Sequence, residues 1–92
     1  MTTTADTPPA CQVNSRIDTL RTDITAIDGE ILTLIDRRIE LSREVGVLRM
    51  AAGGTRLSLA REQVIVDRFT AALGADGTAL AMLLLRAGRG RL

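Results

Sequence analysis

The feature that most constrains this chain is a run of apolar residues that recur every three or four positions, without an intervening proline. Such spacing places the apolar side chains along one face of an α-helix, in a heptad-like seam. The pattern predicts one helix from about residue 15 to Met50, ended by the pair Gly53 and Gly54. The seam consists of Ile17, Leu20, Ile24, Ile27, Ile31, Leu34, Leu41, Val45 and Leu48.

Two shorter helices are predicted after the glycine pair. The second spans Leu59–Leu73, with Ser58 as its N-cap and Gly74 as its end. The third runs from about residue 78 to residue 87 and contains the run LAMLLL, which is apolar on all sides and predicts burial. The fold class is therefore all-α, with one long and two short helices per chain.

The sequence before the long helix differs in character. Residues 1–13 are rich in Thr, Ala and Pro and hold little to bury, so they are predicted to form a disordered tail. Asn14 or Ser15 is the predicted N-cap, and the domain is predicted to span 14–92. Because the start has no basic segment followed by an apolar one, and no apolar run is long enough for a membrane span, we expect a cytoplasmic protein.

The long helix is too long for its own chain to cover. About 36 residues of helix extend about 54 Å, whereas a compact domain of this size is about 30 Å across. A chain of 92 residues also hides only about 60 to 65% of its unfolded surface. We therefore expect an intertwined helical homodimer.

Composition narrows the classes of partner and site. The 12 basic and 11 acidic residues nearly balance, and Phe69 is the only aromatic residue, so neither nucleic acid nor an acidic membrane is the expected partner. All basic residues are Arg, whose planar forks suit carboxylates or phosphates, although genomic base composition produces the same bias. With no His and a single Cys, Cys11, neither a zinc or iron site nor an internal disulfide is expected.

Two arginines interrupt the apolar face of the long helix. Arg38 falls on the heptad line, and Arg49, eleven residues further on, returns to within about 20° of the same face. Neither has an acidic residue three or four positions away, whereas Arg37 has Glu40 and resembles an ordinary solvated pair. An arginine among apolar side chains is costly unless an anion meets it. That anion is either a ligand or an acidic residue across a dimer, and both alternatives stay open.

Two further residues, Glu62 and Gly46, have two interpretations each. Glu62, in the first turn of the second helix, either complements the helix dipole or faces a pocket and accepts a hydrogen bond from a substrate hydroxyl. Gly29 and Gly46 lie inside the long helix, where each costs about 1 kcal/mol relative to Ala. Gly46, one turn before Arg49, either gives a substrate or helix close access or is simply tolerated.

Together these segments resemble the all-helical (AroQ-type) chorismate mutases, which convert chorismate to prephenate. The matching motifs are Leu-Arg near the start of the long helix, Arg-Arg in its middle, Val-Gly-x-x-Arg near its end and Arg-Glu after the turn. The resemblance covers residues 17–92 and is strongest to the short, unfused intracellular members, which form interlocked dimers. It implies an isomerase of phenylalanine and tyrosine biosynthesis, in the shikimate pathway, that needs no cofactor.

The resemblance also implies roles for individual residues. Arg38 is implied to grip the substrate, Arg49 to contact the ether oxygen and Glu62 to hold the ring hydroxyl. Arg21 is implied to enter the site from the other subunit, because it lies about 25 Å from Arg38 along one helix and one small ligand cannot touch both. The further substrate-binding residues implied are Arg61, Ser58 and Thr55.

The third helix departs from the family pattern, because after Thr78 it offers no Gln or Glu for the ether oxygen and no Ser for a carboxylate. We therefore expect a weak isolated enzyme with a mobile C-terminal segment that becomes ordered on contact with a partner. The short subclass is associated with DAHP synthase, the first enzyme of the shikimate pathway, which can activate it. The C-terminal segment expected to contact the synthase consists of Gly88, Arg89, Gly90, Arg91 and Leu92.

Two alternatives come from other classes, and a third lies within the family. A non-catalytic dimerisation module explains the heptads and the Arg-Gly tail, but not two unpaired arginines on one face. A nucleic-acid-binding helical dimer would use its arginines on phosphates, and its affinity would fall steeply with salt. Isochorismate-pyruvate lyases share the family's scaffold and bind a nearly identical dicarboxylate, so the resemblance leaves lyase activity open.

Overall fold

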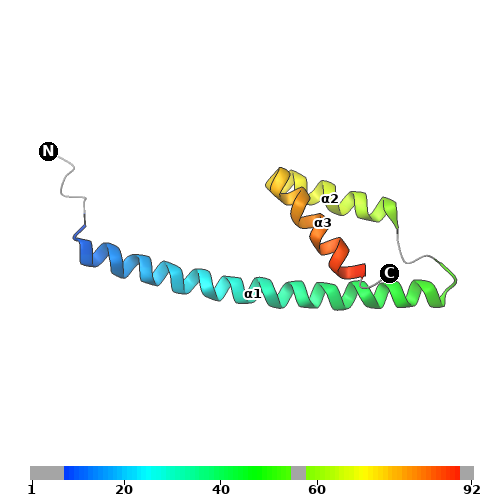
Figure 1. The fold of residues 1–92 in the computed structure, drawn as a ribbon, viewed down its shortest axis with the longest axis horizontal. Coiled ribbons are helices and arrows are strands. Elements are labelled where there is room, and N and C mark those ends of the chain that lie inside the picture. The colour runs from blue at the N-terminus through cyan, green and yellow to red at the C-terminus, as the bar shows by residue number, and fades with distance from the viewer. Residues whose placement is uncertain (1–7, 55–57, 90–92) are drawn as a thin grey trace. The chain divides into compact units, whose positions relative to one another are not determined.

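A computed structural model describes residues 8–54 and 58–89 of the chain, which form three α-helices (Figure 1). The helices are α1 (Ala10–Ala51), α2 (Leu59–Leu73) and α3 (Ala75–Arg89). Neither described range contains a β-strand. The predicted all-α class, with one long and two short helices, is confirmed.

The long helix begins at Ala10, earlier than the sequence pattern predicted. The carbonyl oxygen of Pro9 accepts the first two hydrogen bonds, at 3.0 and 3.1 Å. Proline is tolerated directly before the first helical residue because an N–H there would have no acceptor within the helix. The predicted caps Asn14 and Ser15 therefore lie inside α1, and of the predicted tail only residues 1–7 lie outside the described residues.

The end of α1 is the predicted one. Gly53 adopts φ of 83°, in the left-handed region that glycine enters without a steric penalty. Its N–H donates to the carbonyl oxygen of Met50 at 3.1 Å, and that of Gly54 donates to Arg49 at 2.8 Å. These two bonds form a Schellman motif, which satisfies carbonyl groups that the last turn would otherwise leave free.

Ser58 and Gly74 bound α2, as predicted. The side chain of Ser58 accepts a hydrogen bond from the N–H of Arg61 at 3.3 Å, and Gly74 has φ of 68°. The same glycine also starts α3, because its carbonyl oxygen accepts the N–H of Thr78 at 3.1 Å. With a single residue as the connection, α3 is longer at both ends than the predicted 78–87.

The chain divides into two units within α1, the first ending at Thr33 and the second beginning at Leu34. The described part of the first unit is helical from Ala10 onward, and none of its residues is buried. Its apolar side chains therefore form an exposed stripe along the helix. The large members of the stripe are Val13, Ile17, Leu20, Ile24, Ile27 and Ile31.

In the second unit α2 and α3 pack side by side, and the last turn of α3 meets α1 (Figure 1). Gly77 allows the close packing of α3 on α2, because a Cβ there would overlap the carbonyl group of Phe69. The buried apolar residues described are Ala81, Leu84 and Leu85, all on one face of α3.

In the single chain only one face of the third helix, which was predicted to be buried, is covered. Met82 and Leu83 on the other face of α3 are 56% and 51% exposed. The described residues of the chain supply neighbours for only one face of the helix and leave the rest of the LAMLLL run uncovered. An all-round apolar helix of this kind is expected to bury its second face against another chain.

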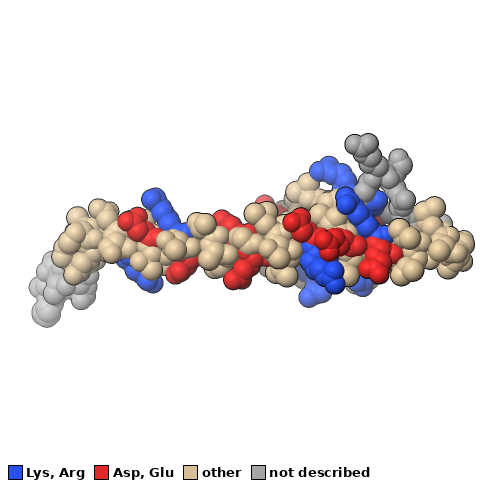
Figure 2. Space-filling model, turned by 90° about the horizontal axis from the view of Figure 1, so that it is seen from below, with Lys and Arg blue, Asp and Glu red and all other residues tan. Residues whose placement is uncertain are grey.

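The part of α1 in the second unit has one covered stripe. Its buried or half-buried residues recur every three or four positions: Ile35, Arg38, Ile39, Ser42, Gly46 and Arg49. This stripe is not the predicted apolar seam, whose members in this unit, Leu34, Leu41, Val45 and Leu48, are all exposed. Acidic and basic side chains lie beside one another along the face of α1 that Figure 2 displays. No broad surface of one sign is seen on that face.

Candidate active site

A cavity of about 300 Å³ opens among α1, α2 and α3 within the second unit. This volume lies at the lower end of the range of about 300 to 1,000 Å³ that is usual for small-molecule sites. Its polar lining consists of Arg38, Ser42, Arg49, Ser58, Arg61 and Glu62. Its apolar lining consists of Leu41, Val45, Ile65 and Leu85.

The two arginines that interrupt the seam both line this cavity. Arg38 and Arg49 are half-buried, and within the described residues neither forms an ion pair with a carboxylate. Arg37, the neighbour of Arg38, is exposed and pairs with Glu40 at 3.3 Å, as predicted. The difference follows from helix geometry, because adjacent residues point about 100° apart around the axis.

The first turn of α2 supplies the opposite wall. Ser58 caps this turn with both of its acceptors: its side chain takes the N–H of Arg61 at 3.3 Å, and its carbonyl oxygen takes the N–H of Glu62 at 3.0 Å. The cap therefore fixes the two charged residues that line the cavity from α2. The positive end of the helix dipole also points here, which favours negative groups near this turn.

Glu62 is bound by Arg89, a contact that the sequence did not predict. The Nε of Arg89 donates to Oε2 of Glu62 at 3.2 Å, and its Nη2 donates to Oε1, so the guanidinium fork engages both carboxylate oxygens. The two side chains are 18% exposed for Glu62 and 27% for Arg89. They lie 27 positions apart on different helices, so no helical periodicity relates them.

This contact corrects part of the prediction for the C-terminal segment. Gly88 and Arg89 were predicted to be mobile, but both belong to α3. Gly88 is buried against Ser42, and the ion pair with Glu62 holds Arg89. Gly90, Arg91 and Leu92, the rest of the segment, lie outside the described residues.

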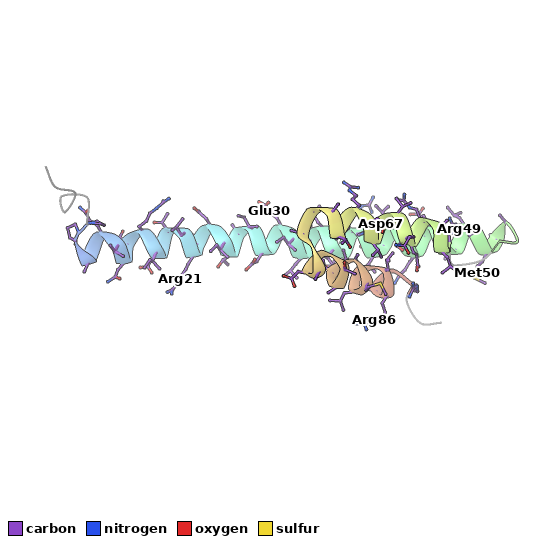
Figure 3. All side chains as sticks on the ribbon, turned by 90° about the horizontal axis from the view of Figure 1, so that it is seen from above. Arg21, Glu30, Arg49, Met50, Asp67 and Arg86 are labelled. Carbon is purple, nitrogen blue, oxygen red and sulfur yellow. The ribbon has the colours of Figure 1, made fainter. Side chains whose placement is uncertain are left out.

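Two of the predicted site residues are not among those that line the cavity. Arg21 is exposed and projects from α1 in the first unit (Figure 3). Thr55 lies outside the described residues. The residues that the structure does bring together around the cavity are Arg38, Arg49, Ser58, Arg61 and Glu62.

A second cavity of about 410 Å³ shares Arg38, Arg61 and Ile65 with the first. Arg68 and Phe69 extend its lining along α2, and sequence reasoning missed both. A helical wheel of α2 gives the signal that was overlooked, because residues 61, 65, 68, 69 and 72 recur every three or four positions. The positive surface around Arg38 therefore continues along α2.

The charge of the first cavity suits an anionic ligand. Three arginines and one glutamate line it, which is a formal charge of +2. A guanidinium group donates in a fixed fork that matches the two oxygens of a carboxylate. A small dianion with two carboxylates therefore matches both the sign and the geometry of the lining.

The described residues hold neither a cluster of metal ligands nor a candidate membrane span. No group of three or more His, Cys, Asp or Glu residues lies close enough together there to hold a metal ion. None of the helices, as far as residues 8–54 and 58–89 define them, has the length and apolarity to cross a membrane.

Known proteins share both the sequence and the fold of this chain. The family described as chorismate mutase type II matches residues 20–83. The intracellular chorismate mutase of Mycobacterium tuberculosis is 55% identical over 76 residues, which cover 83% of this chain and 71% of the relative. That of Mycolicibacterium smegmatis is 48% identical over 85 residues, covering 92% and 82%.

A solved structure gives the same result for the fold. It is a non-covalent complex of DAHP synthase and chorismate mutase from Corynebacterium glutamicum with a bound transition state analog. The matched chain has a TM-score of 0.83 and 42% identity, over 88% of this chain and 98% of that chain. The chain described here therefore belongs to the chorismate mutase type II family and is an isomerase of that family.

Proposed function

We propose that the chain rearranges chorismate to prephenate in the cavity between α1 and the first turn of α2. Three arginines around this one cavity carry the proposal, because chorismate bears two carboxylates and the lining has a formal charge of +2. None of these arginines has a carboxylate partner among the described residues. A dianionic ligand would supply the missing counter-charge.

The reaction suits a cavity with this lining. The Claisen rearrangement is pericyclic, so it requires no proton transfer and no covalent nucleophile. Guanidinium forks on both carboxylates hold the enolpyruvyl side chain over the ring, which turns a rare conformer into the bound one. As the ether bond breaks, negative charge grows on its oxygen, and a fixed donor beside it stabilises the transition state more than the ground state.

The family resemblance supports a division of roles among the lining residues. In this proposal Arg38 and Arg61 hold substrate carboxylates, and Arg49 donates to the ether oxygen. Glu62 accepts a hydrogen bond from the ring hydroxyl. Arg21 of a second copy completes the site, with Ser58 and Thr55 at its edge.

Adjacent arginines on α1 provide the matched test of this function. The purified wild type, Arg38→Ala and Arg37→Ala are each mixed with chorismate, and prephenate formation is followed. We expect Arg38→Ala to lower kcat/KM by about 100-fold or more, because a preorganised charged donor is lost. Arg37→Ala should remain near wild type, because its pair with Glu40 is exposed and contributes little.

Other results would point to other functions. If the wild type forms no prephenate, even with DAHP synthase added, the proposal fails. Release of pyruvate from isochorismate under the same conditions would then assign the chain to the lyases that share this scaffold. Loss of activity in both arginine variants to the same extent would also contradict a specific role for Arg38.

We propose that the active form is a homodimer. The apolar stripe of the first unit, the exposed seam residues of the second and the uncovered face of α3 all need a partner surface. Ile24→Asp, in the middle of the stripe, should dissociate the dimer, whereas Thr25→Asp on the polar face should not. Analytical ultracentrifugation of both variants tests this, and equal masses for the two would contradict the proposed interface.

We further propose that the enzyme is cytoplasmic and that a DAHP synthase binds and activates it. The chorismate mutase of the solved complex binds such a synthase, and the curated relatives are named intracellular. In this chain the contact would involve Gly88, Arg89, Gly90, Arg91 and Leu92. Turnover is compared with and without the DAHP synthase of Corynebacterium glutamicum, and an unchanged rate together with no complex on a sizing column would contradict the proposal.

A further inference from the structure

Arg89 engages Glu62 without belonging to the cavity. Glu62 is one of the residues that line the cavity, whereas Arg89 is not. The guanidinium group nevertheless binds both carboxylate oxygens of Glu62, and both side chains are mostly buried. Arg89 therefore binds Glu62 without itself lining this cavity.

The backbone next to Arg89 is fixed as well. Gly88 is buried, and a Cβ built on it would come within 2.5 Å of the Oγ of Ser42. Ser42 also lines the cavity. The last turn of α3 thus contacts two lining residues, Ser42 through its backbone and Glu62 through its side chain.

We infer that Arg89 is a positioning residue that acts through Glu62. This inference rests on the proposed function and adds a residue to it. A glutamate side chain rotates about three bonds, and the fork of Arg89 restricts that freedom by holding both oxygens. A carboxylate offers about four acceptor positions, so the two that Arg89 occupies leave others for a substrate hydroxyl.

Arg89 also compensates the charge of Glu62. A dianionic substrate that binds beside an unpaired carboxylate meets like-charge repulsion, which is strong at a partly buried position. With Arg89 in place, Glu62 accepts a hydrogen bond from the substrate while the guanidinium group balances its charge. Removal of Arg89 therefore weakens substrate binding and misaligns the acceptor at the same time.

A role for Arg89 as a competitor of the substrate would change kcat/KM in the opposite direction. If Arg89 competed with the substrate for Glu62, its removal would free the carboxylate and raise kcat/KM. The position of Arg89 outside the cavity lining favours the positioning role. A single substitution therefore separates the two by the direction of the change.

The experiment compares Arg89→Ala with Arg86→Ala, using chorismate as the substrate. Arg86 lies one turn earlier on α3, is exposed and points away from α2 (Figure 3), so it is a matched control. We expect Arg89→Ala to lower kcat/KM by about 10-fold to 100-fold, through both a lower kcat and a higher KM. A misplaced group can cost about 100-fold. Arg86→Ala should stay within about twofold of wild type, as surface substitutions usually do.

Arg89→Lys separates the fork from the charge. Lysine keeps the positive charge but cannot bind both carboxylate oxygens in the planar geometry of arginine. We expect it to recover KM more than kcat, because charge compensation returns while alignment does not. Full recovery of both constants by lysine would overturn the claim that the fork aligns Glu62. If Arg89→Ala melts below the assay temperature, the lysine variant still tests whether Arg89 aligns Glu62.

A double variant tests whether Arg89 acts through Glu62. In a Glu62→Gln background, Arg89→Ala should change kcat/KM by less than about twofold, because independent effects add and shared ones do not. A full additional loss there, or equal losses for Arg89→Ala and Arg86→Ala in the wild-type background, would overturn the inference while leaving the proposed function intact. A wild type without turnover on chorismate would overturn both.

Discussion

The backbone of Gly88 lies so close to Ser42 that a Cβ built on the glycine would come within 2.5 Å of the serine Oγ and 2.9 Å of its Cβ. Gly88 belongs to the last turn of α3, and Ser42 lies in the second-unit part of α1. Real Cβ atoms essentially never come so near another heavy atom, so only glycine allows this approach. The contact determines where the end of α3 rests on the long helix.

We therefore predict that Gly88→Ala pushes the last turn of α3 away from α1. The overpacking should cost about 1 to 3 kcal/mol of stability, although alanine is the better helix former. Because Arg89 follows Gly88 and holds Glu62, kcat/KM on chorismate should fall as well. Urea denaturation and steady-state kinetics measure the two effects, and a variant as stable and active as the wild type would contradict the prediction.

Gly29→Ala is the matched control for a glycine in a helix of this chain. A Cβ at Gly29 would meet no atom of the described residues within 4 Å. We predict that this substitution stabilises the protein by about 1 kcal/mol, the usual helix propensity difference. Destabilisation would instead indicate that the backbone of a second copy lies close to Gly29 in the homodimer. Thermal melts at two protein concentrations distinguish these two outcomes, because the stability of a dimer depends on concentration.

The cap of α2 gives a prediction about stability. Ser58→Ala removes the side-chain acceptor of the Arg61 N–H and should cost about 1 kcal/mol. Ser58→Asp keeps an acceptor and adds a negative charge at the positive end of the helix, so it should remain near wild-type stability. Urea denaturation of the three proteins tests this order. Equal stability of the alanine and aspartate variants would show that the cap is not the reason for serine at this position.

The elements that sequence reasoning predicted well are those whose signals are local. The ends of α2 follow from Ser58 and Gly74, and the end of α1 follows from Gly53. Each of these residues acts on hydrogen bonds within a few positions of itself, so the sequence alone contains the cause. The start of α1 was missed because composition was weighted over the helix-starting property of Pro9.

The cavity was predictable in part for the same reason. Arg38 and Arg49 interrupt a periodic pattern, and an interruption is visible in the sequence whatever the tertiary structure. The pair between Glu62 and Arg89 was not predictable, because it joins two helices through the geometry of the connection at Gly74. The burial of Gly88 has the same origin, since it depends on where α3 meets α1.

Arg49 should affect the chemical step more than substrate binding. In the proposed mechanism its partner is the ether oxygen, whose negative charge appears only as the bond breaks. Arg49→Ala should therefore lower kcat by about 100-fold to 1,000-fold with a much smaller change in KM. Met50→Ala, at the exposed adjacent position (Figure 3), should leave both constants near wild type. A change confined to KM in Arg49→Ala would assign the residue to substrate binding instead.

Arg21 gives a test of the dimer and the site together. If the two sites of a homodimer each take Arg21 from the other chain, Arg21→Ala and Arg38→Ala are both nearly inactive as pure proteins. A dimer formed from one copy of each variant then contains one intact site and one site that lacks both arginines. Random exchange makes about half of the dimers mixed, so the mixture should recover about a quarter of the wild-type activity. If Arg21 instead served its own chain, each site in a mixed dimer would lack one arginine, and mixing after dissociation and refolding would leave the activity at the level of the pure variants.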